Sequence, residues 1–171
     1  MDAIDLLKFS VGNAFGILSQ VTADLTQEQA DWVPPGLANP IGATYWHTVS
    51  SADFAVFQWC AGQTPMMESA GWREKALLAS APESEHETRE HMLSIQVDLP
   101  ALHAYAAALA EALQEWLSSL TAEDLGRVLE TPVGELALGQ MLEMFVIWHI
   151  NAHCGEISAL KGCLGVKGYP F

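Results

Sequence analysis

A chain of 171 residues fits one domain, residues 1–171, and because half of its residues are hydrophobic, a disordered chain is excluded. The 7 Lys and Arg residues against 21 Asp and Glu residues give a formal net charge of −14, which repels phosphate backbones and anionic lipid. We therefore expect neither nucleic acid nor a membrane as a partner, while the same charge favours solubility and attracts divalent cations.

The first third of the sequence predicts two long helices with a loop between them. Apolar residues recur at helical spacing from about Ala3 to Val21, and residues 22–39 follow as a loop. In the second helix we expect Asn39 as the N-cap and Pro40 at the first helical position, where its missing N–H costs nothing. This helix should run to about Ala61.

The middle of the sequence, residues 63–97, is its least regular part. We expect a short helix there, from about Thr64 to Leu78. The polar residues 82–89 are expected to form an exposed loop.

Two more long helices complete the predicted elements. Asp98 should cap a third helix that ends near Leu120, and a connection over residues 121–135 leads to a fourth helix from about Ala137 to Leu160. Because no stretch alternates strongly enough to predict a strand, the sequence predicts an all-α fold with four long helices. The long connection between the second and third helices allows an order other than up-down-up-down.

The cysteine pattern favours a reducing compartment. Cys60, Cys154 and Cys163 are an odd number without CxxC spacing, which argues against a disulfide framework and against a thiolate zinc site. The first ten residues are acidic and amphipathic, without the basic and long apolar regions of a signal peptide. We therefore expect a cytoplasmic protein.

The fourth helix places two imidazoles and a carboxylate on its apolar face. At about 100° per residue, His153 lies about 40° from His149, and Glu156 lies about 20° from it on the other side. Titratable groups on a buried face are costly unless they are paired or bound to a metal. The HxxxH spacing brings both imidazoles within reach of one cation.

The second helix supplies a third candidate ligand, His47. Three neutral imidazoles from two helices, with a fourth position left to water, would form a catalytic type of site rather than a closed structural one. Imidazole suits zinc, nickel, copper or iron, and the sequence does not choose among them. A buried histidine is also commonly a hydrogen-bonded core residue, and an HxxxH match arises often by chance.

The remaining candidates are weaker by their position. His86 and His91 lie in or beside an acidic loop, where we expect them to be solvated. His103 lies about 100° from the apolar stripe of the third helix and is expected on the surface. Asp53 lies about 120° from His47 on the second helix and is expected to be a surface charge.

The segments PIGATYWHTVSSADF and WHINAHCGEISALKG, which contain the three histidines, resemble the paired motifs of the DinB-like superfamily. The loop LTQEQADWVPPGLANPIG resembles the family's Trp- and Pro-rich entry to the second helix, and the GxxGYPF ending is also similar. The resemblance covers most of the chain and is weakest over residues 63–97. It implies a four-helix bundle of up-down-down-up order and a divalent metal bound by His47, His149 and His153.

The resemblance also implies a class of function. Characterised relatives include metal-dependent transferases and isomerases that use a low-molecular-weight thiol such as bacillithiol, mycothiol or glutathione, so we expect a thiol S-transferase acting on a small-molecule substrate. The alternatives are a non-catalytic metal- or ligand-binding bundle, such as a stress-response interaction protein, and a metal-free structural bundle. The resemblance and the apolar excess of the chain lead us to expect a homodimer.

Cys154 and Glu156 lie on the fourth helix close to the predicted ligands. Many relatives have a basic residue where this chain has Cys154, which lies about 140° from His149 and should not reach the metal. This departure puts an anion-binding role at that position in doubt. Glu156 could orient an imidazole, act as a base or pair with a neighbouring helix, and we expect it to be hydrogen-bonded near the site without binding the ion.

Overall fold

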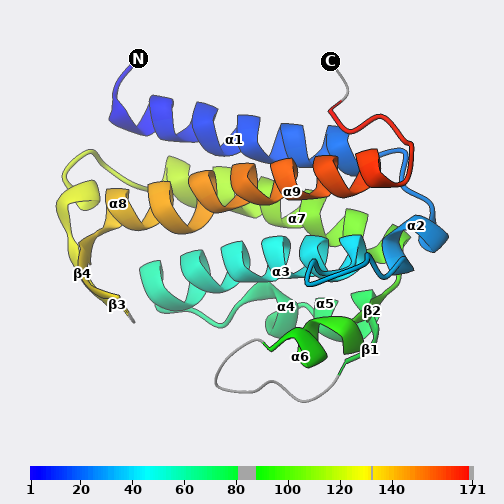
Figure 1. The fold of residues 1–171 in the computed structure, drawn as a ribbon. Coiled ribbons are helices and arrows are strands. Elements are labelled where there is room, and N and C mark those ends of the chain that lie inside the picture. The colour runs from blue at the N-terminus through cyan, green and yellow to red at the C-terminus, as the bar shows by residue number, and fades with distance from the viewer. Residues whose placement is uncertain (81–87, 132, 170–171) are drawn as a thin grey trace.

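The computed structural model describes residues 1–80, 88–131 and 133–169, and these residues are mostly helical (Figure 1). The predicted all-α class is therefore confirmed in its main feature. Four long helical segments form the body of the protein: α1 (Ala3–Thr22), α3 (Ile41–Asp53) with its π-helical continuation η1 (Phe54–Cys60), α7 (Leu99–Ser118), and α8 (Leu138–Leu142) continued by the π-helical η3 (Glu143–Trp148) and by α9 (His149–Cys163).

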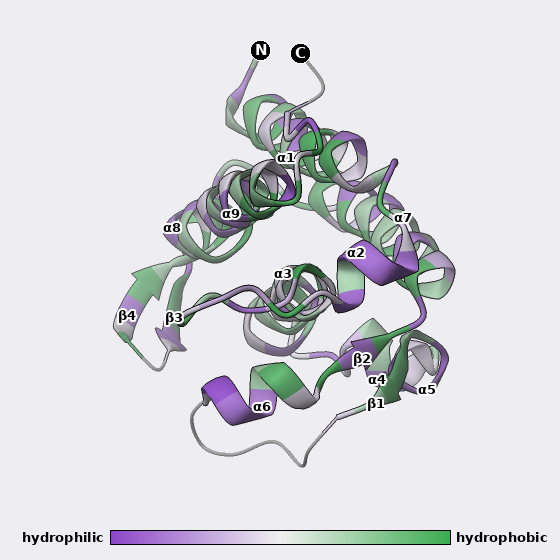
Figure 2. Ribbon diagram, turned by 45° about the vertical axis from the view of Figure 1, so that its right-hand side comes forward, coloured by the Kyte–Doolittle hydropathy of each residue, from purple (hydrophilic) through white to green (hydrophobic). Residues whose placement is uncertain are grey.

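The long segments pack side by side around one core. Helix α1 contacts α7 and α9, and α3 contacts the same two helices from the other side. The colours of Figure 1 show α1 and α9 running in one direction and α3 and α7 in the opposite one. Each long helix combines hydrophobic and hydrophilic residues (Figure 2), and the buried apolar side chains form one contiguous cluster.

Side-chain caps fix where two of these helices begin. The Asp2 carboxylate accepts a hydrogen bond from the backbone N–H of Asp5, and Asp98 caps α7 by accepting from Ala101 N–H, both at 2.9 Å. The start of α3 differs from the prediction, because Pro40 and not Asn39 occupies the N-cap position. The Pro40 carbonyl accepts the first helical hydrogen bond, from Thr44 N–H at 2.9 Å, so the helix begins one residue later than expected.

Two regions predicted as loops contain short elements. Within residues 22–39, α2 (Gln27–Asp31) is nucleated by a reciprocal cap between Thr26 and Gln29. Within residues 121–135, a 3₁₀ turn (Asp124–Gly126) leads into the antiparallel hairpin of β3 (Val128–Thr131) and β4 (Gly134–Ala137). These elements are too short to give a periodic hydrophobic pattern, so the prediction missed them.

The irregular region also differs from its prediction. In place of one short helix, the chain forms α4 (Met66–Ser69) and α5 (Trp72–Ala76), which are separated at Gly71 by a left-handed backbone conformation, φ 65°. Strand β1 (Leu77–Ala79) pairs with β2 (Gln96–Val97), and Arg89, expected in a loop, begins α6 (Arg89–Ser94). Residues 82–87 of that expected loop lie outside the described residues.

Asp53 is a core residue, so its predicted place on the surface was wrong. Its carboxylate is fully buried and accepts hydrogen bonds from Met66 N–H at 2.9 Å, Met67 N–H at 2.7 Å and the Tyr105 hydroxyl at 2.5 Å. Burial raises the pKa of the Asp53 carboxyl above its usual value. Through these bonds Asp53 joins α3 to α4 and α7.

Lys161 makes a second buried polar contact, between α9 and the end of α1. Its side chain is 1% exposed, and Nζ donates to the Val21 carbonyl oxygen at 2.8 Å and to the Asp24 carboxylate. These two bonds satisfy an ammonium group that would otherwise be costly to bury.

Among the described residues, no helix combines the length and the hydropathy needed to cross a bilayer.

Candidate metal centre

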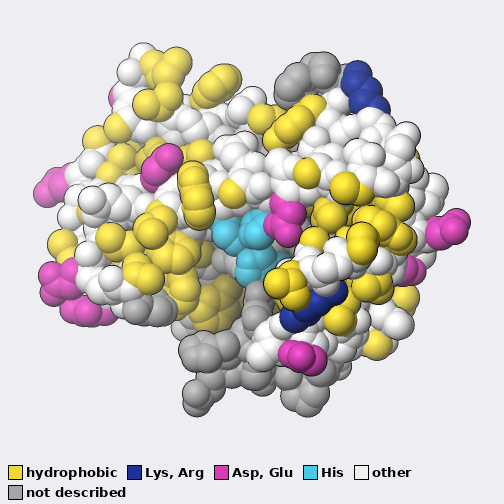
Figure 3. All heavy atoms as spheres, viewed as in Figure 1, with side chains coloured by type: hydrophobic (Ala, Val, Ile, Leu, Met, Phe, Trp, Pro, Cys, Tyr) yellow, Lys and Arg dark blue, Asp and Glu magenta, His cyan; other side chains and the backbone are white. Residues whose placement is uncertain are grey.

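Three imidazoles from two packed helices meet at one point. His47 comes from α3, His149 and His153 come from α9, and the two helices contact each other along their length. The Nε2 atom of His149 lies 3.1 Å from Nε2 of His47 and 3.2 Å from Nε2 of His153. The predicted convergence of the three histidines is therefore confirmed. Figure 3 shows a group of histidine side chains at the surface near the middle of this face.

His153 meets the other two rings edge-on, and the rings of His47 and His149 are tilted relative to each other. Their centroids are 4.5–5.0 Å apart, with interplanar angles of 59°, 81° and 85°. All three side chains are half-buried, so the cluster keeps some contact with solvent.

Glu156 fixes the proton on His153. Its Oε2 lies 2.8 Å from His153 Nδ1, and this hydrogen bond lowers the pKa of the Glu156 carboxyl. The ionised carboxylate can only accept, so Nδ1–H donates to it, and in its neutral form the ring has its lone pair at Nε2. The expectation that Glu156 is hydrogen-bonded beside the site is confirmed. On His47, Nδ1 lies 3.4 Å from Ser51 Oγ, one turn further along α3.

The nitrogen set fits a divalent cation. Ligand nitrogens at about 2.0–2.1 Å from one tetrahedral ion lie about 3.4 Å apart, close to the observed 3.1 and 3.2 Å. His149 Nε2 is next to both other nitrogens, and a single N–H could not point at both of them. A cation at the centre could accept all three lone pairs. Glu156, on the outer nitrogen of His153, is a partner of the kind that metal-binding imidazoles commonly have.

The other candidates lie outside this cluster. His91, predicted to be solvated, is 8% exposed, and His103, predicted on the surface, is half-buried with Nδ1 3.1 Å from the Tyr45 hydroxyl. His86 lies outside the described residues. Cys154 is fully buried as a free thiol, burial raises its pKa to about 12, and it is not among the three residues whose ligand atoms meet.

An aromatic wall beside the histidines was missed in the sequence. The Trp59 ring contacts Phe54 and Phe145 edge-on, with centroids 5.3 and 5.6 Å apart. Phe145 lies one helical turn before His149 and therefore on the same face. The wall is built on the two π-helical segments η1 and η3, and such segments are frequent at functional sites. The i, i+4 spacing of Phe145 and His149 in the sequence indicates the position of this aromatic wall.

Fold and site together define a class: a mostly helical protein that brings three imidazoles together between two of its long helices. A comparison with protein families matches residues 14–157, most of the chain, to the DinB superfamily. The chain belongs to the DinB superfamily.

The comparison with solved structures supports the same fold. A conserved protein from Enterococcus faecalis has a TM-score of 0.75 and 20% sequence identity, with 95% of this chain and 99% of that chain covered. At this identity the likeness shows the fold alone. No curated protein matches the sequence.

Proposed function

We propose that this protein is a metal-dependent enzyme in which His47, His149 and His153 bind one divalent cation. The observation that supports the proposal best is the meeting of three Nε2 atoms at 3.1 and 3.2 Å, with Glu156 fixing the tautomer of His153. The proposal includes a single domain over residues 1–171 whose four long segments form an up-down-down-up four-helix bundle. It also includes a cytoplasmic location and a homodimer.

The arrangement of ligands favours catalysis over a purely structural role. Glu156 contacts the outer nitrogen of His153, so its carboxylate is held away from the inner nitrogens and the protein supplies three ligands. The usual coordination number of four then leaves one position for a water or a substrate. The half-buried side chains of the three histidines give that position contact with solvent.

The proposed reaction is the transfer of a low-molecular-weight thiol to an electrophile. A divalent cation bound at the three imidazoles would lower the pKa of a thiol or water at the open position and so supply a nucleophile at neutral pH. The aromatic wall of Phe54, Trp59 and Phe145 would bind the apolar part of the electrophile. Zinc, nickel, copper and iron all suit the nitrogen set.

Metal analysis of the purified protein tests the first part of the proposal. We expect about one divalent ion per chain, from a three-histidine site. His149→Ala should lose the ion, while His103→Ala, which removes a half-buried histidine on another helix, should keep it. An ion content that is the same in both variants would contradict the proposed site.

A thiol-transfer assay tests the second part. The metal-loaded protein is mixed with 1-chloro-2,4-dinitrobenzene and, in turn, bacillithiol, mycothiol or glutathione, and release of chloride is followed. We expect turnover with one of the thiols and none in His149→Ala. Metal binding without turnover with any thiol would favour the alternative, a non-catalytic metal- or ligand-binding bundle.

A further inference from the structure

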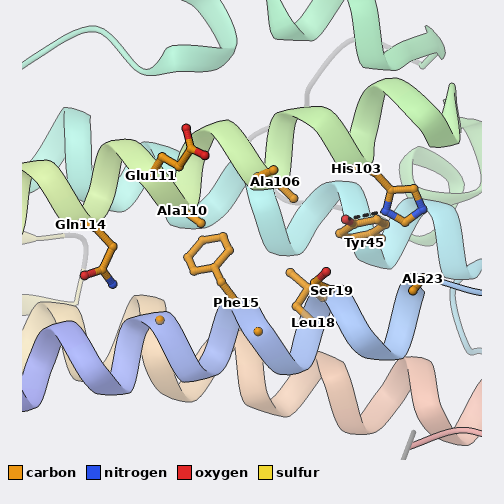
Figure 4. A pocket seen from close by; sticks show the side chains of 13 residues that line it. Phe15, Leu18, Ser19, Ala23, Tyr45, His103, Ala106, Ala110, Glu111 and Gln114 are labelled. Atoms are coloured by element: carbon orange, nitrogen blue, oxygen red, sulfur yellow. Dashed lines mark hydrogen bonds between the residues drawn. The ribbon is translucent and has the colours of Figure 1, made fainter.

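A cavity separate from the histidine cluster is lined by residues of α1 and α7 and by Tyr45 of α3. It has a volume of about 540 Å³ and runs between α1 and α7 (Figure 4). None of the three clustered histidines lines it. Its volume falls within the range of about 300–1,000 Å³ that is typical of small-molecule sites.

The cavity exists because small residues leave space between two packed helices. Gly12 and Gly16 of α1 face Ala107 and Ala110 of α7, and a Cβ atom added at Gly16 would meet nothing within 4 Å. Below these small residues, the floor is apolar and deeply buried. Phe15, Leu18 and Ala106 are 6%, 1% and 8% exposed. Water in this space contacts mostly apolar surface, so its displacement by an apolar group is favourable.

One end of the cavity contains a pair of polar groups. Figure 4 shows Tyr45 and His103 together at this end, while Gln114 lies toward the other end. The Tyr45 hydroxyl and His103 Nδ1 are 3.1 Å apart, so they share one hydrogen bond. Tyr45 is buried, at 1% exposed, whereas the His103 ring is half-buried and uses only Nδ1 in this bond, so its other nitrogen, Nε2, can bind a polar group of a ligand.

The charges around the cavity select against anions. No Lys or Arg is among the described residues that line it, and Glu111 is the acidic residue at its edge. Burial lowers the pKa of His103, so this ring is neutral at neutral pH. The protein as a whole has a net charge of −14, which adds to the repulsion of any anion.

A second copy of this chain is the alternative occupant. If the two-fold axis of a dimer passed through the cavity, the cavity would face the identical cavity of the other chain and both would stay unfilled. A small molecule, by contrast, can fill one cavity completely.

We infer that the cavity between α1 and α7 binds an uncharged small molecule. Its apolar body lies over Phe15, Leu18 and Ala106, and its single polar group is hydrogen-bonded by His103, whose ring the buried Tyr45 hydroxyl holds in place. The site is separate from the histidine cluster, so ligand binding there requires no metal.

Two dyes with the same ring skeleton test this inference. N-phenyl-1-naphthylamine is uncharged, and 8-anilino-1-naphthalenesulfonate differs from it by a sulfonate group. Titration of the full-length protein, followed by dye fluorescence, should show one saturable site for the uncharged dye. The anionic dye should bind at least about ten-fold more weakly.

Substitutions in the wall of the cavity locate the site. Gly16→Leu fills the space and also improves helix propensity, so the protein should stay folded and the affinity for the uncharged dye should fall at least about ten-fold. Ala107→Leu should have the same effect from the opposite wall. Asn13→Leu adds the same side chain at an exposed position of α1 that does not line the cavity, and it should leave the affinity unchanged.

Three outcomes would overturn the inference. The first is no saturable binding of the uncharged dye to the unmodified protein. The second is binding that Gly16→Leu and Ala107→Leu leave intact, because the dye would then lie elsewhere, for example on the aromatic wall. The third is a dimer that dissociates in Gly16→Leu when measured by sedimentation, because a second copy would then cover the cavity.

Discussion

Replacement of Glu156 by Gln measures how far the carboxylate supports the proposed metal site. Its Oε2 lies 2.8 Å from His153 Nδ1, and the lowered pKa of the carboxyl keeps it ionised, so the hydrogen bond is charge-assisted. The amide oxygen of Gln has nearly the same position and can still accept this bond. Glu156→Gln therefore exchanges a charged acceptor for a neutral one at nearly constant shape.

The expected loss follows from this exchange. Hydrogen bonds to charged groups contribute about 1.5–3 kcal/mol and neutral ones about 0.5–1.5 kcal/mol, so the difference is about 1–1.5 kcal/mol. The Glu156 side chain is 36% exposed, and screening by solvent favours the lower end of this range. Metal affinity should fall about five- to ten-fold. Glu156→Ala, which removes the acceptor altogether, should cost about 10–100-fold.

Competition with a fluorescent zinc chelator gives the affinity of each variant. Glu143→Gln is the matched control, because it removes the same charge from an exposed position on η3, and it should leave the affinity unchanged. Complete loss of the ion in Glu156→Gln would refute the reasoning, since Glu156 would then be a direct ligand and the site would have no open position. An unchanged affinity would show that the carboxylate does not support His153.

Three further predictions concern stability and assembly. Burial raises the pKa of the Asp53 carboxyl in the folded protein above its unfolded value of 3.8. The protonated carboxyl should therefore contribute its full stability below pH 3.8, and this contribution should be lost as the pH rises through the pKa of the folded protein. Other carboxyls titrate in the same range, so the test is the difference: in urea unfolding across the acidic range, the unmodified protein should lose stability relative to Asp53→Asn as the pH rises, and equal slopes would contradict this. Lys161→Ala leaves the Val21 carbonyl without its donor and should lower the free energy of unfolding by about 1–3 kcal/mol. Asp24→Asn, at the exposed partner, should cost at most about 1 kcal/mol, and a larger loss would mean that the ion pair dominates. Sedimentation at micromolar concentration should show a homodimer, and a monomer would exclude it.

The candidate site was predictable within each helix but not between helices. The spacing of His149, His153 and Glu156 places them on one face of any regular helix, and α9 is regular over this range. The approach of His47 depends on how α3 packs against α9, and their histidines are 102 residues apart in the sequence. Spacing in the sequence contains no information on such a contact, so only the family resemblance predicted it.

The wrong positions predicted for Asp53 and His103 have a common physical cause. The burial of Asp53 depends on the backbone of Met66 and Met67, which belong to the region that the sequence predicted least well. A helical wheel describes one helix and omits partners of this kind. His103 was misplaced for the same reason, because its partner Tyr45 comes from another helix.

The separation of the ligands along the chain also affects folding. His47 and His149 are 102 residues apart, so a cation bound by both would close a loop that contains more than half of the protein. Because only the folded chain brings these imidazoles together, the free energy of binding adds to the stability of the folded state. At a free ion concentration of about 100 times Kd the gain is about 2.7 kcal/mol, provided that the unfolded chain does not bind the ion. The availability of metal in the cell would then control the lifetime of the folded protein as well as its activity.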